Sequence, residues 1–314
     1  MNLLPNPALM KKELLGGLLA SKKTISPKFL YDERGSKLFE EICTLDEYYP
    51  SRAEIEILST HSRAIAQWIG EDAILIEPGC GNCRKVEIIL RTLSQPRAYV
   101  ALDISKKFLE ETTSQLQKKH QEIPIFPVVA DYTRDLILPP ELENTNQKRV
   151  VFFPGSTIGN LEPSDAKKLL REMGILIKRC GGLLIGVDLK KESEVLERAY
   201  DDSKGVSAEF NYNLLDRLNR EFDGSFDRSK FKYVARYNAQ AGRMEMGLVS
   251  LVPQKVDLAG STIQLSEDEA IHTESSYKYT PQEFISMADE CGYEIKTYWM
   301  DAFKRFCVYY FETR

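Results

Sequence analysis

Residues 74–85 read ILIEPGCGNCRK and combine two patterns that can do chemistry. Gly79-x-Gly81 follows an apolar, strand-like run, and glycines in such a place let the backbone turn tightly and approach a ligand closely. Cys80 and Cys83 form a C-x-x-C pair, the spacing of thiol redox centres and of half a zinc site. The glycines therefore predict a nucleotide-like cofactor, whereas the cysteines indicate redox or metal chemistry.

Acidic and aromatic residues follow at the ends of the next two strand-like runs. Asp103 ends the run 98–103, where a carboxylate can accept hydrogen bonds from both ribose hydroxyls of a nucleoside. Asp131 and Tyr132 stand at the end of the next run, 125–131, where a carboxylate can meet an adenine amino group and an aromatic ring can cover the base. No Walker lysine followed by Ser or Thr is found in the sequence, which argues against a P-loop.

The cysteine pair has a simpler interpretation. A zinc site needs two further ligands, but there is no second C-x-x-C, and the histidines at 61, 120 and 272 show no ligand spacing. Cys83 also stands where the third small residue of a cofactor loop falls. We therefore interpret Cys80 and Cys83 as small packing residues and expect no metal.

The elements that must position these residues alternate along the middle of the chain. Apolar runs rich in β-branched residues predict buried strands at 73–77, 98–103, 125–131, 149–154 and 182–188. Helix-like stretches lie at 83–93, 105–120, 163–179 and 281–291. This alternation predicts an α/β fold with a parallel, doubly wound sheet.

Two more strand-like runs, 293–301 and 305–313, follow the last helix with a very short connection, which allows only an antiparallel hairpin. Parallel strands closed by such a hairpin are typical of Rossmann-like class I methyltransferases. The hairpin, the glycine turn and the acids at successive strand ends together favour S-adenosylmethionine over NAD or ATP.

The remaining segments, 1–53 and 190–278, do not fit the alternation. We interpret them as one discontinuous substrate-binding α+β domain, packed over the C-terminal edge of the sheet. Residues 54–189 and 279–314 then form the S-adenosylmethionine-binding methyltransferase domain. The strand-like runs of the second domain are 231–238 and 244–252.

Composition limits the class of partner. The 314-residue chain has a net charge of −5 and no polybasic run, which argues against nucleic acid and anionic membranes. The N-terminal apolar stretch is broken by prolines and charges, unlike a signal peptide, and no window approaches the length of a membrane span. Six dispersed cysteines do not make a disulfide framework. We expect a cytoplasmic monomer with reduced thiols.

Five strings elsewhere in the chain carry more specific information. They are YDERGSKLFEEICTLDEYYPSRAE (31–54), FFPGSTIGNLEP (152–163), AYDDSKGVSAEFNYNLL (199–215), RMEMGL (243–248) and HTESSYKY (272–279). Together they resemble the L-histidine Nα-methyltransferases of ergothioneine biosynthesis, and the likeness covers nearly the whole chain from residue 27. The resemblance implies a Rossmann-like domain, a discontinuous substrate domain, and S-adenosylmethionine-dependent trimethylation of free L-histidine to hercynine.

The resemblance also implies roles for the matching residues. Asn160 and Tyr200 would hold the substrate α-carboxylate, and Glu274 and Ser276 would bind the imidazole. Tyr48, Gly155 and Met246 would line the pocket, and Tyr31 would lie near the amine. The cofactor would be bound by Gly79, Lys85, Asp103, Asp131 and Tyr132. Tyr31 and Tyr48 are the expected catalytic residues.

These residue types also make chemical sense by themselves. A carboxylate such as Glu274 and a hydroxyl such as Ser276 can each engage one imidazole nitrogen. Tyrosine faces tolerate the cation that successive methylations produce. Each residue also has a purely structural alternative: Tyr48 as a core aromatic, Asn160 as a helix cap, Met246 as core filler, and Glu274 as a solvated acid.

The chain departs from the family pattern in two places. Cys80 and Cys83 stand where the family tends to carry serine or threonine beside the glycines, and Ser207 stands where threonine is common. The first departure affects thiol sensitivity or cofactor affinity and leaves the backbone geometry available.

Other functions compete with histidine methylation. Relatives methylate a prenylated tryptophan, but indole offers a single donor, so Glu274 and Ser276 favour imidazole. A non-catalytic cofactor-binding module would be expected to have lost part of this constellation. A nucleic-acid methyltransferase would carry an Asn/Asp-Pro-Pro-aromatic motif where FFPGSTIGN stands.

Overall fold

The computed structural model describes residues 7–134 and 136–314 of the chain. They form two compact units. The first unit comprises Pro50–Lys190 and Tyr277–Arg314, and the second comprises residues 7–49 and Lys191–Ser276. The boundaries drawn from the sequence, after residues 53, 189 and 278, fall near these limits. The first six residues of the predicted substrate domain lie outside the described part.

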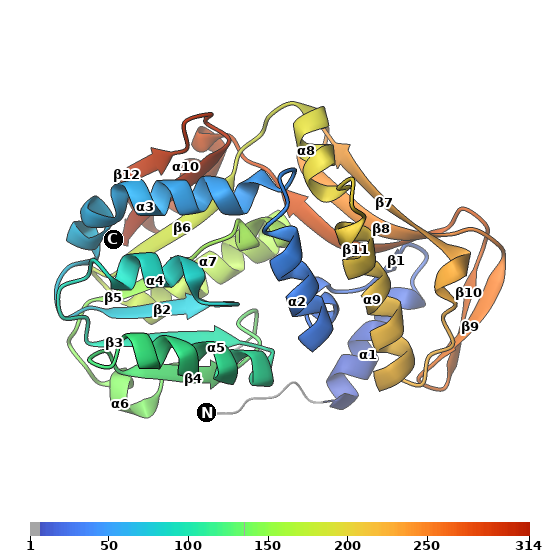
Figure 1. Ribbon diagram of the computed structural model, residues 1–314, viewed down its shortest axis with the longest axis horizontal. Coiled ribbons are helices and arrows are strands. Elements are labelled where there is room, and N and C mark those ends of the chain that lie inside the picture. Colours follow the sequence, from blue (N-terminus) through green and yellow to red (C-terminus); the bar gives the residue numbers. More distant parts are fainter. Residues whose placement is uncertain (1–6, 135) are drawn as a thin grey trace. The chain divides into compact units, whose positions relative to one another are not determined.

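In the described part of the first unit, the sheet has seven strands in the order β12-β13-β6-β5-β2-β3-β4 (Figure 1). The strands are β2 (Ile74–Pro78), β3 (Ala98–Asp103), β4 (Ile125–Val129), β5 (Arg149–Phe153), β6 (Gly182–Asp188), β12 (Tyr293–Met300) and β13 (Phe306–Thr313). Strands β2 to β6 pair in parallel, and β13 is antiparallel to both β6 and β12. The predicted Rossmann-like sheet closed by an antiparallel hairpin is confirmed.

Helices cover both faces of this sheet, which explains why its central strands are apolar on both sides. They are α3 (Tyr49–Ile69), α4 (Arg84–Leu90), α5 (Lys106–Lys119), α6 (Pro140–Glu143), α7 (Pro163–Ile177) and α10 (Pro281–Glu290), with the 3-10 helix η2 (Thr157–Asn160). Ile74 and Ile76 of β2 belong to the core shared with α7 and α10. Leu75, between them, belongs to the core shared with α3, α4 and α5. Successive residues of one strand therefore supply two separate cores.

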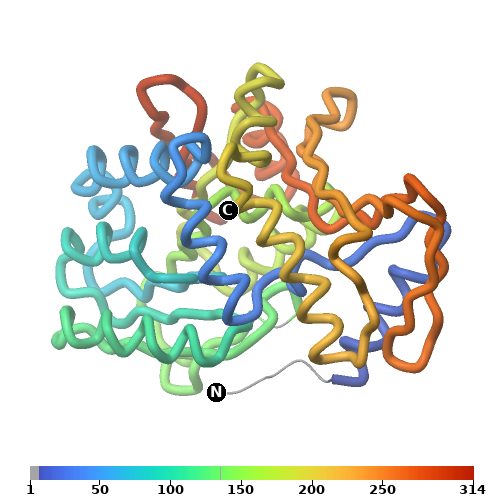
Figure 2. Tube along the Cα trace, turned by 45° about the vertical axis from the view of Figure 1, so that its right-hand side comes forward, coloured from blue at the N-terminus to red at the C-terminus, as the bar shows by residue number. Residues whose placement is uncertain are grey.

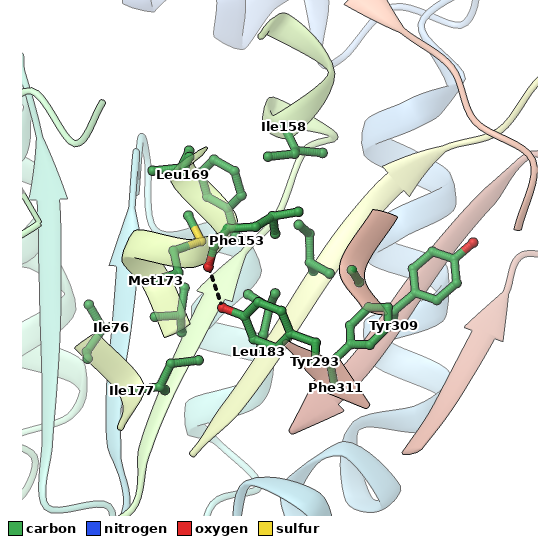
Figure 3. Packing of buried hydrophobic residues seen from close by; sticks show 14 of the residues in the cluster. Ile76, Phe153, Ile158, Leu169, Met173, Ile177, Leu183, Tyr293, Tyr309 and Phe311 are labelled. Atoms are coloured by element: carbon green, nitrogen blue, oxygen red, sulfur yellow. Dashed lines mark hydrogen bonds between the residues drawn. The ribbon is translucent and has the colours of Figure 1, made fainter. Parts of the chain in front are cut away.

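The C-terminal hairpin is part of the first of these cores (Figure 3). Tyr293, at the start of β12, donates its hydroxyl to the carbonyl oxygen of Leu170 on α7 at 2.7 Å. The ring of Phe311 on β13 meets Tyr293 edge-on, with 6.2 Å between centroids. Tyr309 lies 5.3 Å from the ring of Phe284 on α10. These contacts explain why the last strands are so rich in aromatic residues.

The second unit contains a four-stranded sheet in the order β1-β11-β8-β7 and a separate β9-β10 hairpin, within the described residues. Its strands are β1 (Lys23–Thr24), β7 (Phe231–Asn238), β8 (Arg243–Ser250), β9 (Gln254–Leu258), β10 (Ser261–Leu265) and β11 (Ala270–Tyr277). Its helices are α1 (Pro7–Leu18), α2 (Glu33–Ile42), α8 (Ser193–Tyr200) and α9 (Val206–Glu221), with the 3-10 helices η1 (Pro27–Leu30) and η3 (Arg228–Lys230). The strands predicted at 231–238 and 244–252 correspond to β7 and β8.

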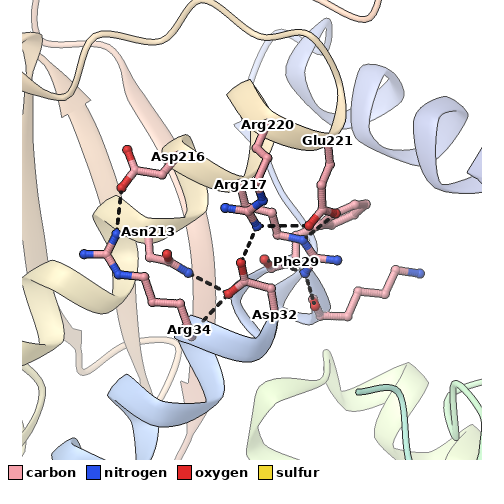
Figure 4. A network of polar contacts seen from close by, with 10 residues as sticks. Phe29, Asp32, Arg34, Asn213, Asp216, Arg217, Arg220 and Glu221 are labelled. Carbon is pink, nitrogen blue, oxygen red and sulfur yellow. Dashed lines mark hydrogen bonds and ion pairs between the residues drawn. The ribbon is translucent and has the colours of Figure 1, made fainter. Parts of the chain in front are cut away.

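Helix α2 lies beside α9 (Figures 1 and 2), and one carboxylate ties them together (Figure 4). Asp32 caps α2 by accepting a hydrogen bond from the Gly35 amide at 2.7 Å. It also accepts from Asn213 at 2.8 Å and from Arg220 at 2.6 Å, both on α9. A Cβ at Gly35 would lie 1.8 Å from the Leu30 carbonyl oxygen. Part of the YDERGS string is therefore architectural.

Candidate active site

The glycine turn lies between β2 and α4. Gly79 and Gly81 both have positive φ, 71° and 53°, which glycine adopts without a Cβ penalty. The Gly79 amide donates to the carbonyl oxygen of Leu102 at 2.7 Å. The Gly81 amide donates to Asp103 Oδ2 at 3.2 Å. The turn is thus attached to the end of β3, and the two are fixed as one structure.

Tyr132 covers the turn. A Cβ built on Gly79 would lie 3.2 Å from Tyr132 Cε1, so the ring and the glycine backbone are in close contact. The Tyr132 ring meets Phe153 of β5 edge-on at 5.7 Å. Its neighbour Asp131 accepts hydrogen bonds from the amide and the hydroxyl of Thr133, at 3.1 and 2.5 Å. The ends of β2, β3 and β4 thereby bring together four of the predicted cofactor residues.

The Asp103 carboxylate is oriented by the backbone. Oδ1 accepts from the Ser105 amide at 2.9 Å, while Oδ2 accepts from Gly81. Burial raises the pKa of the Asp103 carboxyl, and the amides of Ser105, Gly81 and Ile104 oppose that rise. Each carboxylate oxygen can accept more than one hydrogen bond. The group is therefore suited to meet a pair of ribose hydroxyls.

Lys85, the fifth predicted cofactor residue, lies in the first turn of α4. Its Nζ is 2.6 Å from Oε2 of Glu54, a residue of α3. A Cβ built on Gly155 would lie 3.4 Å from the same Nζ. The structure thus brings Lys85 next to Gly155, a residue predicted to line the substrate pocket.

Gly155 and Asn160 lie in the loop and 3-10 helix that follow β5. Gly155 and Ser156 both have positive φ, 82° and 57°. Ser156 Oγ accepts a hydrogen bond from the Asp188 amide at 2.9 Å. The N-cap position of α7 belongs to Glu162, so Asn160 is not the cap of that helix. Capping therefore does not account for the asparagine.

A buried ion pair lies near this loop in the first unit. Lys278 Nζ is 2.7 Å from Asp188 Oδ2, and both side chains are fully buried. Breaking such a pair on one side leaves an uncompensated buried charge. Sequence reasoning gave this pair no role, because its members are far apart along the chain.

The cysteine pair lies inside the core that α3, α4 and α5 share. Both thiols are free and buried. A hydrogen bond to Cys83, together with burial, raises the pKa of Cys80 well above its ordinary value. The same hydrogen bond lowers the pKa of Cys83, and burial opposes that fall. Cys80, kept protonated and buried, is a poor nucleophile and metal ligand. Within residues 7–134 and 136–314, no group of three or more His, Cys, Asp or Glu side chains is arranged to hold a metal ion.

In the second unit, β11 carries both residues predicted to bind the imidazole. Glu274 and Ser276 stand two positions apart on this strand, so their side chains leave the same face. Both are largely buried, at 9% and 3% exposure. The Tyr200 hydroxyl is 2.9 Å from Ser276 Oγ. Tyr200 and Ser276, predicted to hold opposite ends of the substrate, are therefore hydrogen-bonded to each other.

Tyr48 belongs to the same group of side chains. Its ring meets Tyr200 edge-on at 5.9 Å. Burial raises the pKa of Tyr48 well above its ordinary value, and the nearby Tyr200, Cys43, Tyr31 and Glu274 add to the rise. Tyr48 is thus a neutral phenol close to the Glu274 carboxylate.

Tyr31 and Met246 complete the predicted set. Tyr31 packs edge-on against Phe39 and Phe210, at 5.6 and 5.4 Å. Met246, on β8, is 2% exposed and belongs to the hydrophobic core of the second unit, as does Tyr48. Strand β8 neighbours β11 in the sheet. Tyr31, Tyr48, Tyr200 and Met246 therefore lie in or against one core.

Sequence reasoning missed three aromatic members of this group, Phe39, Phe210 and Tyr233. The Tyr233 hydroxyl donates to the Tyr200 carbonyl oxygen at 2.7 Å. Burial, and next the Glu274 carboxylate, raise the pKa of Tyr233 well above its ordinary value. The available signal was the alternation of β7, whose burial pattern marks Tyr233 as inward-facing.

Comparison with known proteins identifies the family. A family model described as histidine-specific methyltransferase, SAM-dependent, matches residues 10–313. The chain belongs to this family. It is therefore an S-adenosylmethionine-dependent methyltransferase.

Known proteins of related sequence align over most of the chain. The histidine N-alpha-methyltransferase of Mycobacterium tuberculosis is 34% identical over 297 residues, and this alignment covers 93% of the present chain and 91% of the relative. Identity is 32% over 277 residues to ergothioneine biosynthesis protein 1 of Neurospora crassa, covering 86% and 31% respectively. It is 28% over 328 residues to an L-tryptophan methyltransferase of Psilocybe serbica, covering 95% and 91%.

The residues present in this methyltransferase fit its cofactor. Because Gly79 has no side chain, there is space between its backbone and the Tyr132 ring, which a Cβ would occupy. Asp103 and Asp131 are carboxylates oriented by backbone amides.

Within the described residues, none of the helices combines the length and apolarity needed to cross a membrane.

Proposed function

We propose that this methyltransferase transfers three methyl groups to the α-nitrogen of free L-histidine, giving hercynine in ergothioneine biosynthesis. The observation that carries the substrate is the pair Glu274 and Ser276 on one face of β11. A carboxylate that accepts and a hydroxyl that donates or accepts match the two nitrogens of an imidazole. The family description and the names of the 34% and 32% identical relatives support the same substrate.

The cofactor side rests on the first unit. We assign the ribose hydroxyls to Asp103, the adenine to Asp131 and Tyr132, the close backbone approach to Gly79, and the cofactor's carboxylate to Lys85. When bound, S-adenosylmethionine supplies an electrophilic methyl group on its sulfonium. Methyl transfer would be an in-line displacement in which the amine lone pair forms the N–C bond, the C–S bond breaks to leave S-adenosylhomocysteine, and the proton lost from the nitrogen passes to water. The main task of the protein is therefore to orient the neutral amine.

The substrate side rests on the residues that match the family pattern. Asn160 and Tyr200 would hold the α-carboxylate, and Gly155 and Met246 would line the pocket. Tyr31 and Tyr48 would orient the amine. Because burial keeps Tyr48 a neutral phenol, we assign its oxygen the role of hydrogen-bond acceptor to the amine rather than that of a phenolate base. Tyrosine faces would also stabilise the methylated cation.

A mass-spectrometric assay with saturating S-adenosylmethionine tests the substrate. We expect histidine to gain one, two and three methyl groups, and tryptophan to gain none. Glu274→Ala should lower kcat/KM for histidine by about 100-fold, because a buried charge-assisted hydrogen bond is lost. Glu269→Gln is the control, because this half-buried carboxylate stands just before β11 and pairs with Lys23 at 3.0 Å; the variant should keep full activity. Methylation of tryptophan but not histidine, or full activity of Glu274→Ala, would overturn the assignment.

We also propose that the enzyme is a cytoplasmic monomer. All six of its cysteines are free, which suits a reducing compartment. Sedimentation equilibrium measures the mass directly, and a species of twice 35.9 kDa would contradict the monomer.

A further inference from the structure

Glu54 is a buried carboxylate to which the proposed mechanism gives no part. It lies in α3, and its side chain is fully buried. A buried carboxylate is costly unless it is both paired with a cation and hydrogen-bonded. Its contacts therefore indicate what the charge is for.

The Glu54 carboxylate meets two groups that belong to different parts of the candidate site. Oε2 is 2.6 Å from Lys85 Nζ. Oε1 and Oε2 both accept from the Gly155 amide, at 3.0 and 2.8 Å. A Cβ at Gly186 would lie 1.9 Å from Oε1, so β6 leaves room for this carboxylate only because a glycine stands there. Glu54 is thus enclosed and held in one position.

The lysine differs from its partner in exposure. The Lys85 side chain is 20% exposed, whereas Glu54 is 0% exposed, so the ion pair is buried on the Glu54 side. An ammonium carries three donors and can serve more than one carboxylate. Long side chains lose much rotamer freedom when they bind a ligand. Because Glu54 already holds the Lys85 ammonium in place, the lysine side chain loses less rotamer freedom when a ligand binds.

We propose that Glu54 is a positioning residue for methyl transfer. Its carboxylate fixes the Lys85 ammonium and the Gly155 amide relative to each other, so that the lysine meets the cofactor's carboxylate at one defined place. This rests on the proposed role of Lys85 in cofactor binding. Glu54 itself need not touch the cofactor, since it acts through Lys85.

A double-mutant cycle on cofactor-product affinity tests this role. S-adenosylhomocysteine is titrated calorimetrically into the full-length enzyme and into the variants Glu54→Gln, Lys85→Met and Glu54→Gln/Lys85→Met. We expect Glu54→Gln to weaken binding by about tenfold, the loss caused by one unfixed side chain. We expect the double variant to bind no more weakly than Lys85→Met alone, because the effect of Glu54 passes through the lysine.

Two further variants separate positioning from stability. Asp301→Asn removes another buried carboxylate that pairs with an arginine, Arg305, and accepts backbone amides, but in the loop between β12 and β13. It should lower the melting temperature and leave S-adenosylhomocysteine affinity unchanged. Glu54→Asp keeps the charge with a shorter reach and supplies the same readout if Glu54→Gln does not fold.

The outcomes are distinct. Wild-type affinity in Glu54→Gln, or losses that multiply in the double variant, would overturn the inference. The titration contains no histidine, so an enzyme that binds S-adenosylhomocysteine but fails to methylate histidine would overturn the proposed substrate alone.

Discussion

Gly79 shows how a single residue can decide cofactor access. Its φ of 71° is unfavourable for any residue with a Cβ, and that Cβ would press on the Tyr132 ring at 3.2 Å. To relieve the backbone strain or the contact with Tyr132, either the turn or the Tyr132 ring must move. Both are groups assigned to the adenosine part of the cofactor.

We predict that Gly79→Ala weakens S-adenosylhomocysteine binding by about tenfold, because the added Cβ displaces the turn or the Tyr132 ring from the cofactor site, and about 1.4 kcal/mol of lost binding energy is tenfold. Isothermal titration measures the loss. Gly70→Ala is the matched control, because Gly70 has a φ of 89° but nothing lies within 4 Å of a Cβ built there. It should cost stability and leave affinity as it is. Equal effects of the two substitutions on affinity would refute the close-approach argument.

At this scale the sequence indicated residues at strand ends better than contacts between positions that no element pattern connects. Gly79 directly follows β2, Asp103 ends β3 and Tyr132 lies three residues after β4, and parallel strands bring their ends to one edge. Glu54 and Gly155 are separated by 101 residues, and nothing local marks their contact. The Tyr200–Ser276 hydrogen bond is likewise invisible in a linear pattern.

Helix α9 illustrates how an element of the second unit is fixed. Asp202, three residues before the helix N-cap Gly205, accepts hydrogen bonds from the amides of Lys204, Val206 and Ser207 at 3.1, 3.0 and 2.7 Å. It therefore satisfies N–H groups that the first turn leaves without helical partners. Ser207 makes this contact through its backbone amide.

We predict that Asp202→Ala lowers the free energy of unfolding by about 2 kcal/mol, measured in urea at neutral pH. Burial raises the Asp202 pKa, but hydrogen bonds from Ser207, Val206 and Lys204 outweigh it, so the folded-state pKa is lowered. The negative charge of Asp202 therefore stabilises the fold at pH values above the ordinary pKa of 3.8. This contribution to the free energy of unfolding is lost as the pH falls through the lowered folded-state pKa.

Asp202→Asn is the control, because it keeps an acceptor oxygen without the charge. The free energy of unfolding of Asp202→Asn should be lowest relative to the wild type at neutral pH, and the difference should shrink as the pH falls. A deficit that grows on acidification would show that the sign of the pKa shift is wrong.

The elements of the first unit were predictable because their signals are strong. Buried parallel strands give uninterrupted apolar runs, and Pro163 and Pro281 mark helix starts. In the second unit, β9, β10 and β11 are short or polar. Pairing within a sheet, rather than local propensity, makes β11 a strand.

At the scale of the whole molecule, the two units have separate hydrophobic cores. The chain has two tryptophans, and both Trp68 on α3 and Trp299 on β12 belong to the first unit. Tryptophan fluorescence therefore reports on the unit assigned to the cofactor, whereas far-UV circular dichroism reports on both.

We predict that S-adenosylhomocysteine at 100 times its dissociation constant stabilises the fluorescence-detected unfolding transition by about 2.7 kcal/mol. The circular dichroism signal should split, with a second component that the ligand shifts less. Urea titrations with both probes measure this. Asp103→Asn is the control and should abolish most of the shift. Identical shifts by both probes would mean that the chain unfolds as a single cooperative body.

The alternation of β11 bears on how the family diversifies. Thr273, on the opposite face from Glu274 and Ser276, donates its hydroxyl to the buried Asn211 at 2.6 Å and secures the strand to its own unit. Changes at 274 and 276 leave that anchor untouched. Substitutions at 274 and 276 can therefore change what this face of the strand binds while the hydrogen bond that holds the strand in its unit persists.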